Sequence, residues 1–167
     1  MIVIGIDNGS TGQIGFISSN DYKLIKTPVL NTLSYTKTVN WINRVDYLKF
    51  KEYIFNTITE LNEPVKMVFL ERPMINPTRF KNSILAARAL EATIICLEEL
   101  NLPYCYIDSK EWQPKILPIG LKTEQLKKAS LEVGKRKYPN MTWSSEFKDA
   151  DGFHIAQHGY NKIMEKN

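Results

Sequence analysis

The sequence predicts an α/β fold in which helices lie on the faces of a mixed β-sheet. Three short β-rich runs follow one another at the N-terminus, and two later apolar runs alternate with segments of helical periodicity. The chain has 167 residues, 43% hydrophobic and 24% charged, which suits one ordinary domain with a complete core. We therefore expect a single domain over residues 1–167, with a five-stranded sheet whose first three strands are antiparallel.

The N-terminal third predicts three strands. The first run is β-rich and apolar and ends at Asp7, and the Asn-Gly-Ser-Thr-Gly sequence that follows predicts a turn into the second strand. The third strand closes near Pro28, and the Thr/Asn-rich stretch after it predicts an irregular connection over residues 30–44. The three strands are expected at residues 2–7, around 15–17 and at 22–29.

The rest of the chain predicts four helices and two strands. Apolar residues at spacings of three and four mark residues 46–61 as an amphipathic helix. Residues 65–70 form an almost continuous apolar run, typical of a strand buried on both faces, and a proline-containing loop follows over 72–77. The remaining elements are a helix at 83–100, a strand at 104–107, and helices at 122–137 and 149–164.

Composition narrows the class of protein. No apolar run approaches the roughly 20 residues that span a bilayer, and an acid interrupts the apolar N-terminus, so we expect a strand there and not a signal peptide. Cys96 and Cys105 both lie in segments predicted to be buried, where reduced thiols are the default in an intracellular protein. We therefore expect a cytoplasmic protein.

The charge is concentrated in one stretch. The net charge is +4, and nine Lys/Arg residues between 110 and 148 face only four glutamates. A solvated helix face accounts for such a stretch, but the interleaved Trp112, Tyr138 and Trp143 favour a nucleic-acid surface, because rings stack on bases while cations neutralise phosphates.

Two of the predicted strands end in carboxylates, Asp7 and Glu71. If the first and fourth strands are neighbours in the sheet, these acids lie a few ångströms apart at one edge. Two carboxylates so close repel unless a cation lies between them, and an all-oxygen site suits Mg²⁺ or Mn²⁺. The alternative is that Asp7 caps a turn and Glu71 pairs with Arg72 or Arg79.

A second acidic pair, Asp149 and Asp151, lies at the predicted start of the last helix. Acids at a helix N-terminus also serve as caps, so capping is the alternative explanation. One shared metal site explains all the acids together. Two residues turn an ideal helix by about 200°, so both aspartates reach the metals only if Asp149 precedes the helical backbone.

Three segments carry a family resemblance. Residues 4–9 (IGIDNG), 69–73 (FLERP) and 150–156 (ADGFHIA) resemble, in order and spacing, the acidic motifs of RuvC-like Holliday junction resolvases, which have the RNase H-like fold. The resemblance implies Asp7, Glu71 and Asp151 as catalytic metal ligands, with Asp149 as a conditional fourth. The family usually has an acid or a histidine three residues before the last aspartate, and Lys148 stands there in this chain.

The same resemblance implies a homodimer that binds four-way or other branched DNA and nicks two strands symmetrically, leaving 5′-phosphates. Two Mg²⁺ ions per site, replaceable by Mn²⁺, would act on an in-line attack of water at the phosphate. The compact basic form suits a phage or other mobile-element enzyme. Similar resolvases place an aromatic residue after the second acid; this loop offers Met74 and then Phe80. Candidate DNA contacts are Arg72, Met74, Arg79, Phe80, Lys122, Lys127 and Lys128.

Several features admit other interpretations. The turn at residues 7–11 resembles the first phosphate-binding loop of actin-like ATPases and sugar kinases, although that family needs a longer chain. A DNA-binding module without catalysis is a further alternative. His154 and His158 have metal-ligand spacing, but packing is favoured because no third nitrogen or sulfur ligand is near. Asp108 is read as a turn former, and the helix at 83–100 suits a core position and a dimer seam equally.

Overall fold

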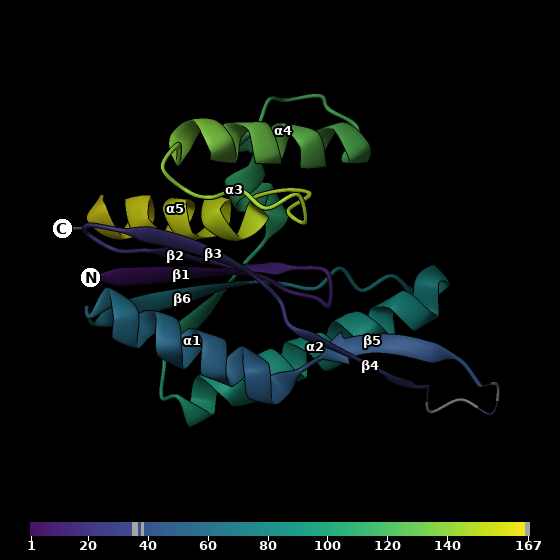
Figure 1. The fold of residues 1–167 in the computed structure, drawn as a ribbon. Helices are drawn as coiled ribbons and strands as arrows, with labels where there is room; N and C mark the ends of the chain where they lie inside the picture. The colour runs from purple at the N-terminus through teal and green to yellow at the C-terminus, as the bar shows by residue number, and fades with distance from the viewer. Residues whose placement is uncertain (35–36, 38, 166–167) are drawn as a thin grey trace.

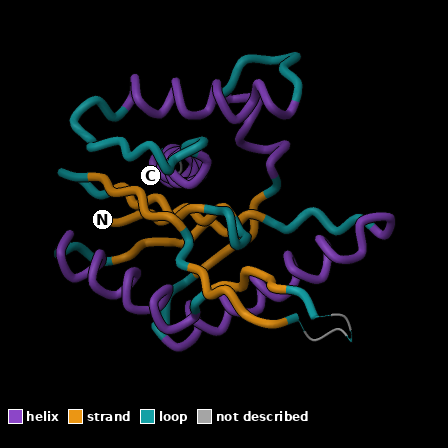
Figure 2. Tube along the Cα trace, turned by 45° about the vertical axis from the view of Figure 1, so that its right-hand side comes forward, coloured by secondary structure: helices purple, strands orange, loops and turns teal. Residues whose placement is uncertain are grey.

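A five-stranded mixed sheet forms the centre of the computed structural model, which describes residues 1–34, 37 and 39–165 (Figures 1 and 2). The strand order is β3-β2-β1-β6-β7. β1 pairs with β2, and β2 with β3, in antiparallel fashion, whereas β6 runs parallel to both β1 and β7. The strands are β1 Ile2–Asp7, β2 Gln13–Ile17, β3 Tyr22–Lys26, β6 Val65–Glu71 and β7 Tyr104–Ile107. The predicted fold class, with its first three strands antiparallel, is confirmed.

Helices cover both faces of this sheet. α1 and α2 lie on one face, and α3, α4 and α5 lie on the other, with α4 outermost above α5 (Figure 1). Their bounds are α1 Tyr47–Leu61, α2 Phe80–Glu99, α3 Ser109–Ile116, α4 Thr123–Lys137 and α5 Asp151–Met164. Among the described residues, none of the helices combines the length and the apolar character that crossing a membrane requires.

β1 is buried on both sides because it is the central strand. Ile2, Ile4 and Ile6 point into the core shared with α1 and α2, while Val3 packs into the core on the α5 side. This alternation is the period-2 pattern of a strand. It fixes the register that brings the end of β1 beside the end of β6, where Ile6 is opposite Leu70.

Three glycines allow α5 to lie directly on the sheet. Gly5 and Gly15 are opposite one another in β1 and β2. A Cβ on Gly15 would lie 2.4 Å from the carbonyl of Gly152, and one on Gly5 would lie 2.2 Å from the backbone nitrogen of Ala156. Because no side chain separates helix and strands here, the first turn of α5 is held against β1 and β2, close to Asp7 at the end of β1.

The predicted irregular connection over residues 30–44 is wrong in its main part. Two strands, β4 Val29–Leu33 and β5 Trp41–Val45, pair there as a separate antiparallel hairpin. The third strand of the large sheet correspondingly ends at Lys26, before Pro28, and not at residue 29. The hairpin has no regular alternation of apolar and polar residues, because β4 is largely exposed and buries no complete face. Residues 35, 36 and 38 of this stretch lie outside the described part.

Helix α3 has no counterpart among the predicted elements. Its eight residues include Pro114, which removes a backbone donor and hides the helical pattern. Asp108 is the N-cap of this helix, and its backbone N–H donates to the Glu111 carboxylate at 3.0 Å. The predicted turn at Asp108 is thus a helix start. Helix α2 begins at residue 80, three residues earlier than expected, because a short 3-10 turn, Pro77–Arg79, leads into it.

Candidate active site

The carboxyl ends of β1 and β6 place two acids side by side. Asp7 is the last residue of β1 and Glu71 the last residue of β6, in neighbouring parallel strands. Their carboxyl groups are within hydrogen-bonding reach of each other. The structure thus places these two acids together at one edge of the sheet, as the strand pattern predicts.

The start of α5 brings the other two acids to the same edge. α5 begins at Asp151, Ala150 is its N-cap, and Asp149 precedes the cap. Carboxylate oxygens of Asp7, Asp149 and Asp151 all lie within 4.8 Å of one another. The geometric condition on Asp149 is therefore met, because its backbone is not helical. Lys148, at the position where resolvases carry an acid or histidine, is exposed.

Glu71 is held by an indole that the sequence did not suggest. The Nε1–H of Trp112 in α3 donates to Glu71 Oε1 at 3.0 Å, and the Trp112 side chain is fully buried. The bond fixes Oε1 of the Glu71 carboxylate. Because α3 was not predicted, Trp112 was interpreted as a surface ring.

Asp151 is held by a buried serine. Ser130 of α4 has no exposed surface; its hydroxyl donates to Asp151 Oδ1 and accepts the backbone N–H of Ala150 at 3.0 Å. Its carbonyl is 2.9 Å from Nε2 of His154, which is fully buried as well. Ser130 lies on the apolar stripe of α4 with Leu126 and Val133, at a spacing of four and three residues. A polar residue on such a stripe is the signal that could have revealed it.

Asp149 is fixed from two sides. The side-chain amide of Gln13, at the start of β2, donates to its backbone carbonyl at 2.9 Å. The ammonium of Lys127 lies 3.3 Å from Asp149 Oδ2, and this carboxylate is almost wholly buried. Lys127, predicted as a phosphate contact, thus neutralises part of the acidic group.

The four acids face an electrostatic cost together. Burial raises the pKa of Asp7 well above its ordinary value, and the charges of Glu71, Asp151 and Asp149 raise it further. Burial, followed by the charge of Asp149, raises the pKa of Asp151 to about 7. Burial also raises the pKa of Glu71, against the hydrogen bonds from Trp112 and Asp7. Bringing these groups together as carboxylates therefore requires positive charge beyond the single ammonium of Lys127.

A hard divalent cation fits this set of donors. The described group offers only carboxylate oxygens, the ligands that Mg²⁺ and Mn²⁺ prefer, and no soft sulfur or imidazole nitrogen. His154 and His158 lie outside it; burial lowers the pKa of His154 to about 4, in keeping with the packing role expected for it. Asp108 also lies outside it and is 3.5 Å from Nε of Arg72.

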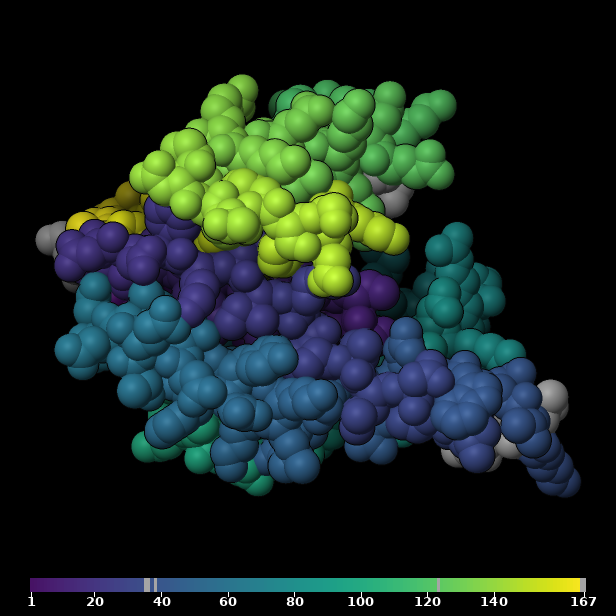
Figure 3. Space-filling view, in the orientation of Figure 1, coloured from purple at the N-terminus to yellow at the C-terminus, as the bar shows by residue number. Residues whose placement is uncertain are grey.

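The predicted DNA-contact residues surround the acids unevenly. Figure 3 shows a hollow between the start of α4 and the segment leading into α2, with the end of β1 at its base. Met74 and Phe80 on that segment are 84% and 69% exposed, as a stacking or wedging role would require. Arg72 stacks over the Tyr106 ring at 5.3 Å to its centre, toward β7. Arg79, Lys122 and Lys128 are exposed.

The predicted aromatic stacking surface is wrong. Trp112 is 0% exposed and Tyr138 is 5% exposed. Tyr138 stacks on Phe153 inside the core, and Trp143 packs edge-on against Phe147. Tyr138 ends α4 and Trp143 lies in the loop after it, and both rings pack toward Phe153 of α5, while the neighbouring lysines face solvent.

No protein-family model and no curated protein matches the chain. Solved structures do. RuvC from Thermus thermophilus in complex with a Holliday junction substrate is 13% identical with a TM-score of 0.58, over 99% of this chain and 96% of that one. A second T. thermophilus RuvC structure, also 13% identical, gives a TM-score of 0.55 over 99% and 97% of the two chains.

Fowlpox virus resolvase, solved with substrate Holliday junction DNA, is 15% identical with a TM-score of 0.50, over 98% and 99% of the two chains. These likenesses span almost the whole of each chain. At such low identity they are likenesses of fold. Together with the strand order, they show that this chain has the RNase H-like fold of RuvC-type resolvases.

Proposed function

We propose that this protein is a metal-dependent, structure-selective DNA endonuclease that resolves Holliday junctions or other branched DNA. The observation that carries the proposal is the convergence of Asp7, Asp149 and Asp151 within 4.8 Å, with Glu71 against Asp7, in a chain with the resolvase fold. In the proposed reaction, water attacks a scissile phosphate in line. The leaving group is a 3′-oxygen, so the products carry 5′-phosphates.

The four acids would hold two Mg²⁺ ions, with Mn²⁺ as a substitute. When bound, such ions stabilise charge on the attacking and leaving oxygens. Asp7 interacts with Glu71 and also with Asp149 and Asp151, so its carboxylate would help to hold both ions. The bonds from Trp112 and Ser130 orient the two outer carboxylates, so little reorganisation is needed on binding.

Lys127 would have two partners in this scheme. In the structure its ammonium neutralises Asp149 at 3.3 Å, while more than half of its side chain is exposed. Once cations neutralise the acids, this ammonium is free to turn toward a DNA phosphate at the hollow. Lys122, the N-cap of α4, and Lys128, in its first half, would add contacts to the DNA backbone that carry affinity without sequence preference.

We propose further that the protein acts as a homodimer in the cytoplasm of the cell or host, because paired nicks across a four-way junction need two sites. α2 supports this arrangement. One face of it joins the core through Ala89, Thr93 and Leu97, while Ile95 is 41% exposed on the other. The helix thus has both the core role and an outer apolar surface. Sedimentation equilibrium of the purified protein tests the dimer.

The activity is tested with purified protein on four-way, three-way and linear duplex DNA, in Mg²⁺, Mn²⁺ or Ca²⁺. We expect nicks in the four-way junction with Mg²⁺ or Mn²⁺, and 5′-phosphate ends that a ligase reseals. Asp7→Asn should abolish cleavage while leaving junction binding nearly intact. Asp21→Asn is the matched control, because Asp21 lies in the turn between β2 and β3, at the opposite end of these strands from Asp7.

Each alternative outcome has a distinct meaning. Cleavage by Asp7→Asn at the wild-type rate would contradict the metal site. Binding without cleavage in every metal would leave a non-catalytic DNA-binding module. Thermal stabilisation by ATP that Asp7→Asn abolishes, without action on DNA, would instead indicate the phosphotransferase alternative.

A further inference from the structure

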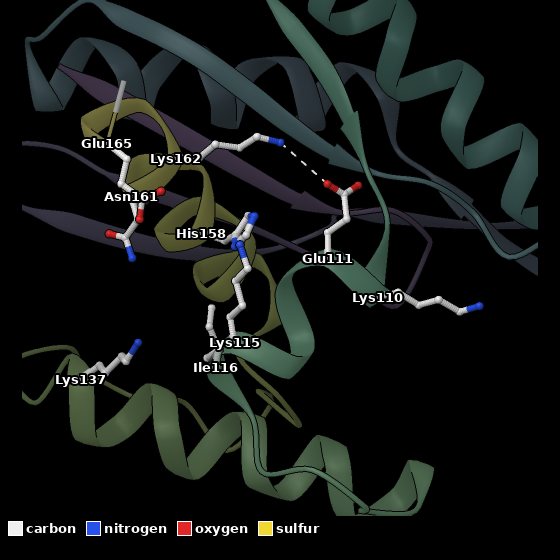
Figure 4. A pocket seen from close by; sticks show the side chains of 9 residues that line it. All are labelled: Lys110, Glu111, Lys115, Ile116, Lys137, His158, Asn161, Lys162 and Glu165. Carbon is white, nitrogen blue, oxygen red and sulfur yellow. Dashed lines mark ion pairs between the residues drawn. The ribbon is translucent and has the colours of Figure 1, made fainter. Parts of the chain in front are cut away.

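A basic cavity lies among three helices, away from the four acids. It has a volume of about 550 Å³, within the range of small-molecule sites. Figure 4 shows side chains from α3, the end of α4 and the second half of α5 around it. It is lined by Lys110, Glu111, Lys115, Ile116, Lys137, His158, Asn161, Lys162 and Glu165.

The cavity is separate from the proposed metal site. His158 is seven residues beyond Asp151 on α5, which places it about 10 Å further along the helix axis. The side chain of Trp112, whose indole contacts Glu71, is buried on the inner side of α3, while Glu111 and Lys115 of the same helix are exposed and face the cavity. No residue of the acidic group lines the cavity.

The lining favours an anion of more than one charge. Four lysines face two glutamates, and only one lining residue, Ile116, is aliphatic, so apolar ligands and cations are disfavoured. Lys162 is 3.8 Å from Glu111, as the dashed line in Figure 4 marks. Among the described residues, Lys110, Lys115 and Lys137 form no ion pair.

A neutral donor and a buried imidazole complete the lining. The Asn161 side-chain oxygen accepts from Gln157 at 2.9 Å, which leaves its amide N–H groups available to an acceptor. His158 is 6% exposed at the cavity wall. Burial lowers the pKa of His158, and the positive charges of Lys115 and Lys162 lower it further.

We propose that this cavity binds phosphate groups, through the ammonium groups of Lys115, Lys137 and Lys162 and the amide of Asn161. Phosphate offers several acceptor oxygens and more than one charge, which a single carboxylate does not. The phosphate comes either from a free di- or triphosphate or from the backbone of a DNA arm that passes outside the hollow. The inference stands without the proposed nuclease activity, since it uses none of the acidic residues.

The test follows the two histidine rings by NMR, because the chain has only two histidines. Sodium pyrophosphate and, separately, a short linear DNA duplex are titrated in EDTA at constant ionic strength. A bound phosphate close to the ring favours the imidazolium, so the pKa of His158 should rise by about 1. His154, bonded to the Ser130 carbonyl in the core, is the internal control and should not change.

Two variants distinguish binding at this cavity from a nonspecific attraction between the phosphate probe and the positively charged protein. The exposed pair Lys115→Gln/Lys137→Gln should weaken pyrophosphate binding at least about tenfold, the loss of about 1.4 kcal/mol in binding energy. Lys66→Gln, an exposed lysine on β6, is the matched control and should bind as the wild type does. Both variants replace exposed side chains, so folding should be retained and is checked by circular dichroism.

The outcomes divide cleanly. A response to pyrophosphate alone assigns the site to a free polyphosphate, and a response to the duplex alone assigns it to a DNA arm. A response to both still supports a phosphate site. No response of His158 to either probe at millimolar concentration, or equal binding by the double variant and the wild type, would overturn the proposal. Neither result depends on DNA cleavage.

Discussion

Replacing Asp7 with Asn should stabilise the metal-free protein. The substitution keeps the shape of the side chain but removes one charge from a group whose oxygens lie within 4.8 Å. At an effective dielectric constant of about 20, two full charges at that distance repel by about 3.5 kcal/mol. Shared protons and the Lys127 ammonium already relieve part of this repulsion. A net gain of about 1–2 kcal/mol remains, which for a chain of this size raises Tm by roughly 2–8 °C.

The pH dependence fixes the sign of the effect. The pKa of Asp151 is raised to about 7 in the folded protein, against an ordinary value of 3.8, and that of Asp7 is raised as well. Between about pH 4 and 7 the folded state therefore holds protons that the unfolded chain has released. Stability of the wild type falls as pH rises through this window. The advantage of Asp7→Asn should be largest near pH 8 and should nearly vanish near pH 4.

Thermal melts in EDTA at pH 4 and pH 8 measure this difference, with Asp21→Asn as the control at each pH. Added Mg²⁺ should raise the Tm of the wild type at pH 8 and have little effect on Asp7→Asn, because a bound ligand stabilises only the state that binds it. A lower Tm for Asp7→Asn than for the wild type in EDTA at pH 8 would refute the reasoning. So would a difference that does not change with pH.

Two further substitutions test how the site is held. Ser130→Ala removes the donor to Asp151 and leaves the buried N–H of Ala150 without its acceptor, so the free energy of unfolding should fall by about 2–4 kcal/mol. Its Mg²⁺ affinity, measured by calorimetry, should fall about 10–100-fold, and wild-type values for both quantities would contradict the positioning role. Gly15→Ala places a Cβ 2.4 Å from the backbone of Gly152. It should cost at least about 2 kcal/mol in urea unfolding; a neutral result would show that α5 can move off the strands without loss.

The parts of the fold that sequence periodicity predicts are those with a buried face. β1 and β6 carry continuous apolar runs because the sheet buries them on both sides, and their terminal acids could be placed from the strand pattern alone. The β4–β5 hairpin could not be predicted in this way. It pairs only with itself and leaves Leu33 and Trp41 more than half exposed, so neither of its strands carries the regular alternation of apolar and polar residues that a buried face imposes.

The residues that hold the acids, Ser130 and Trp112, could not be predicted from the sequence pattern either. Asp149 and Asp151 stand beside a motif, but Ser130 and Trp112 reach the site from two helices that only the tertiary packing brings there. For Trp112, the sequence pattern predicts a surface role that the structure contradicts and gives no sign of its bond to Glu71. Its lysine neighbours suggested a nucleic-acid surface, whereas the short helix α3 turns the ring inward.

The order of the elements along the chain makes the acidic group a late product of folding. Asp7 ends the first strand, and Asp149 and Asp151 lie at the start of the last helix, so no fragment that stops short of α5 contains the group. During synthesis the chain must extend past Asp151 before these carboxylates can meet. A nascent chain that ends before α5 therefore lacks the assembled acidic group, and the docking of α5 completes it.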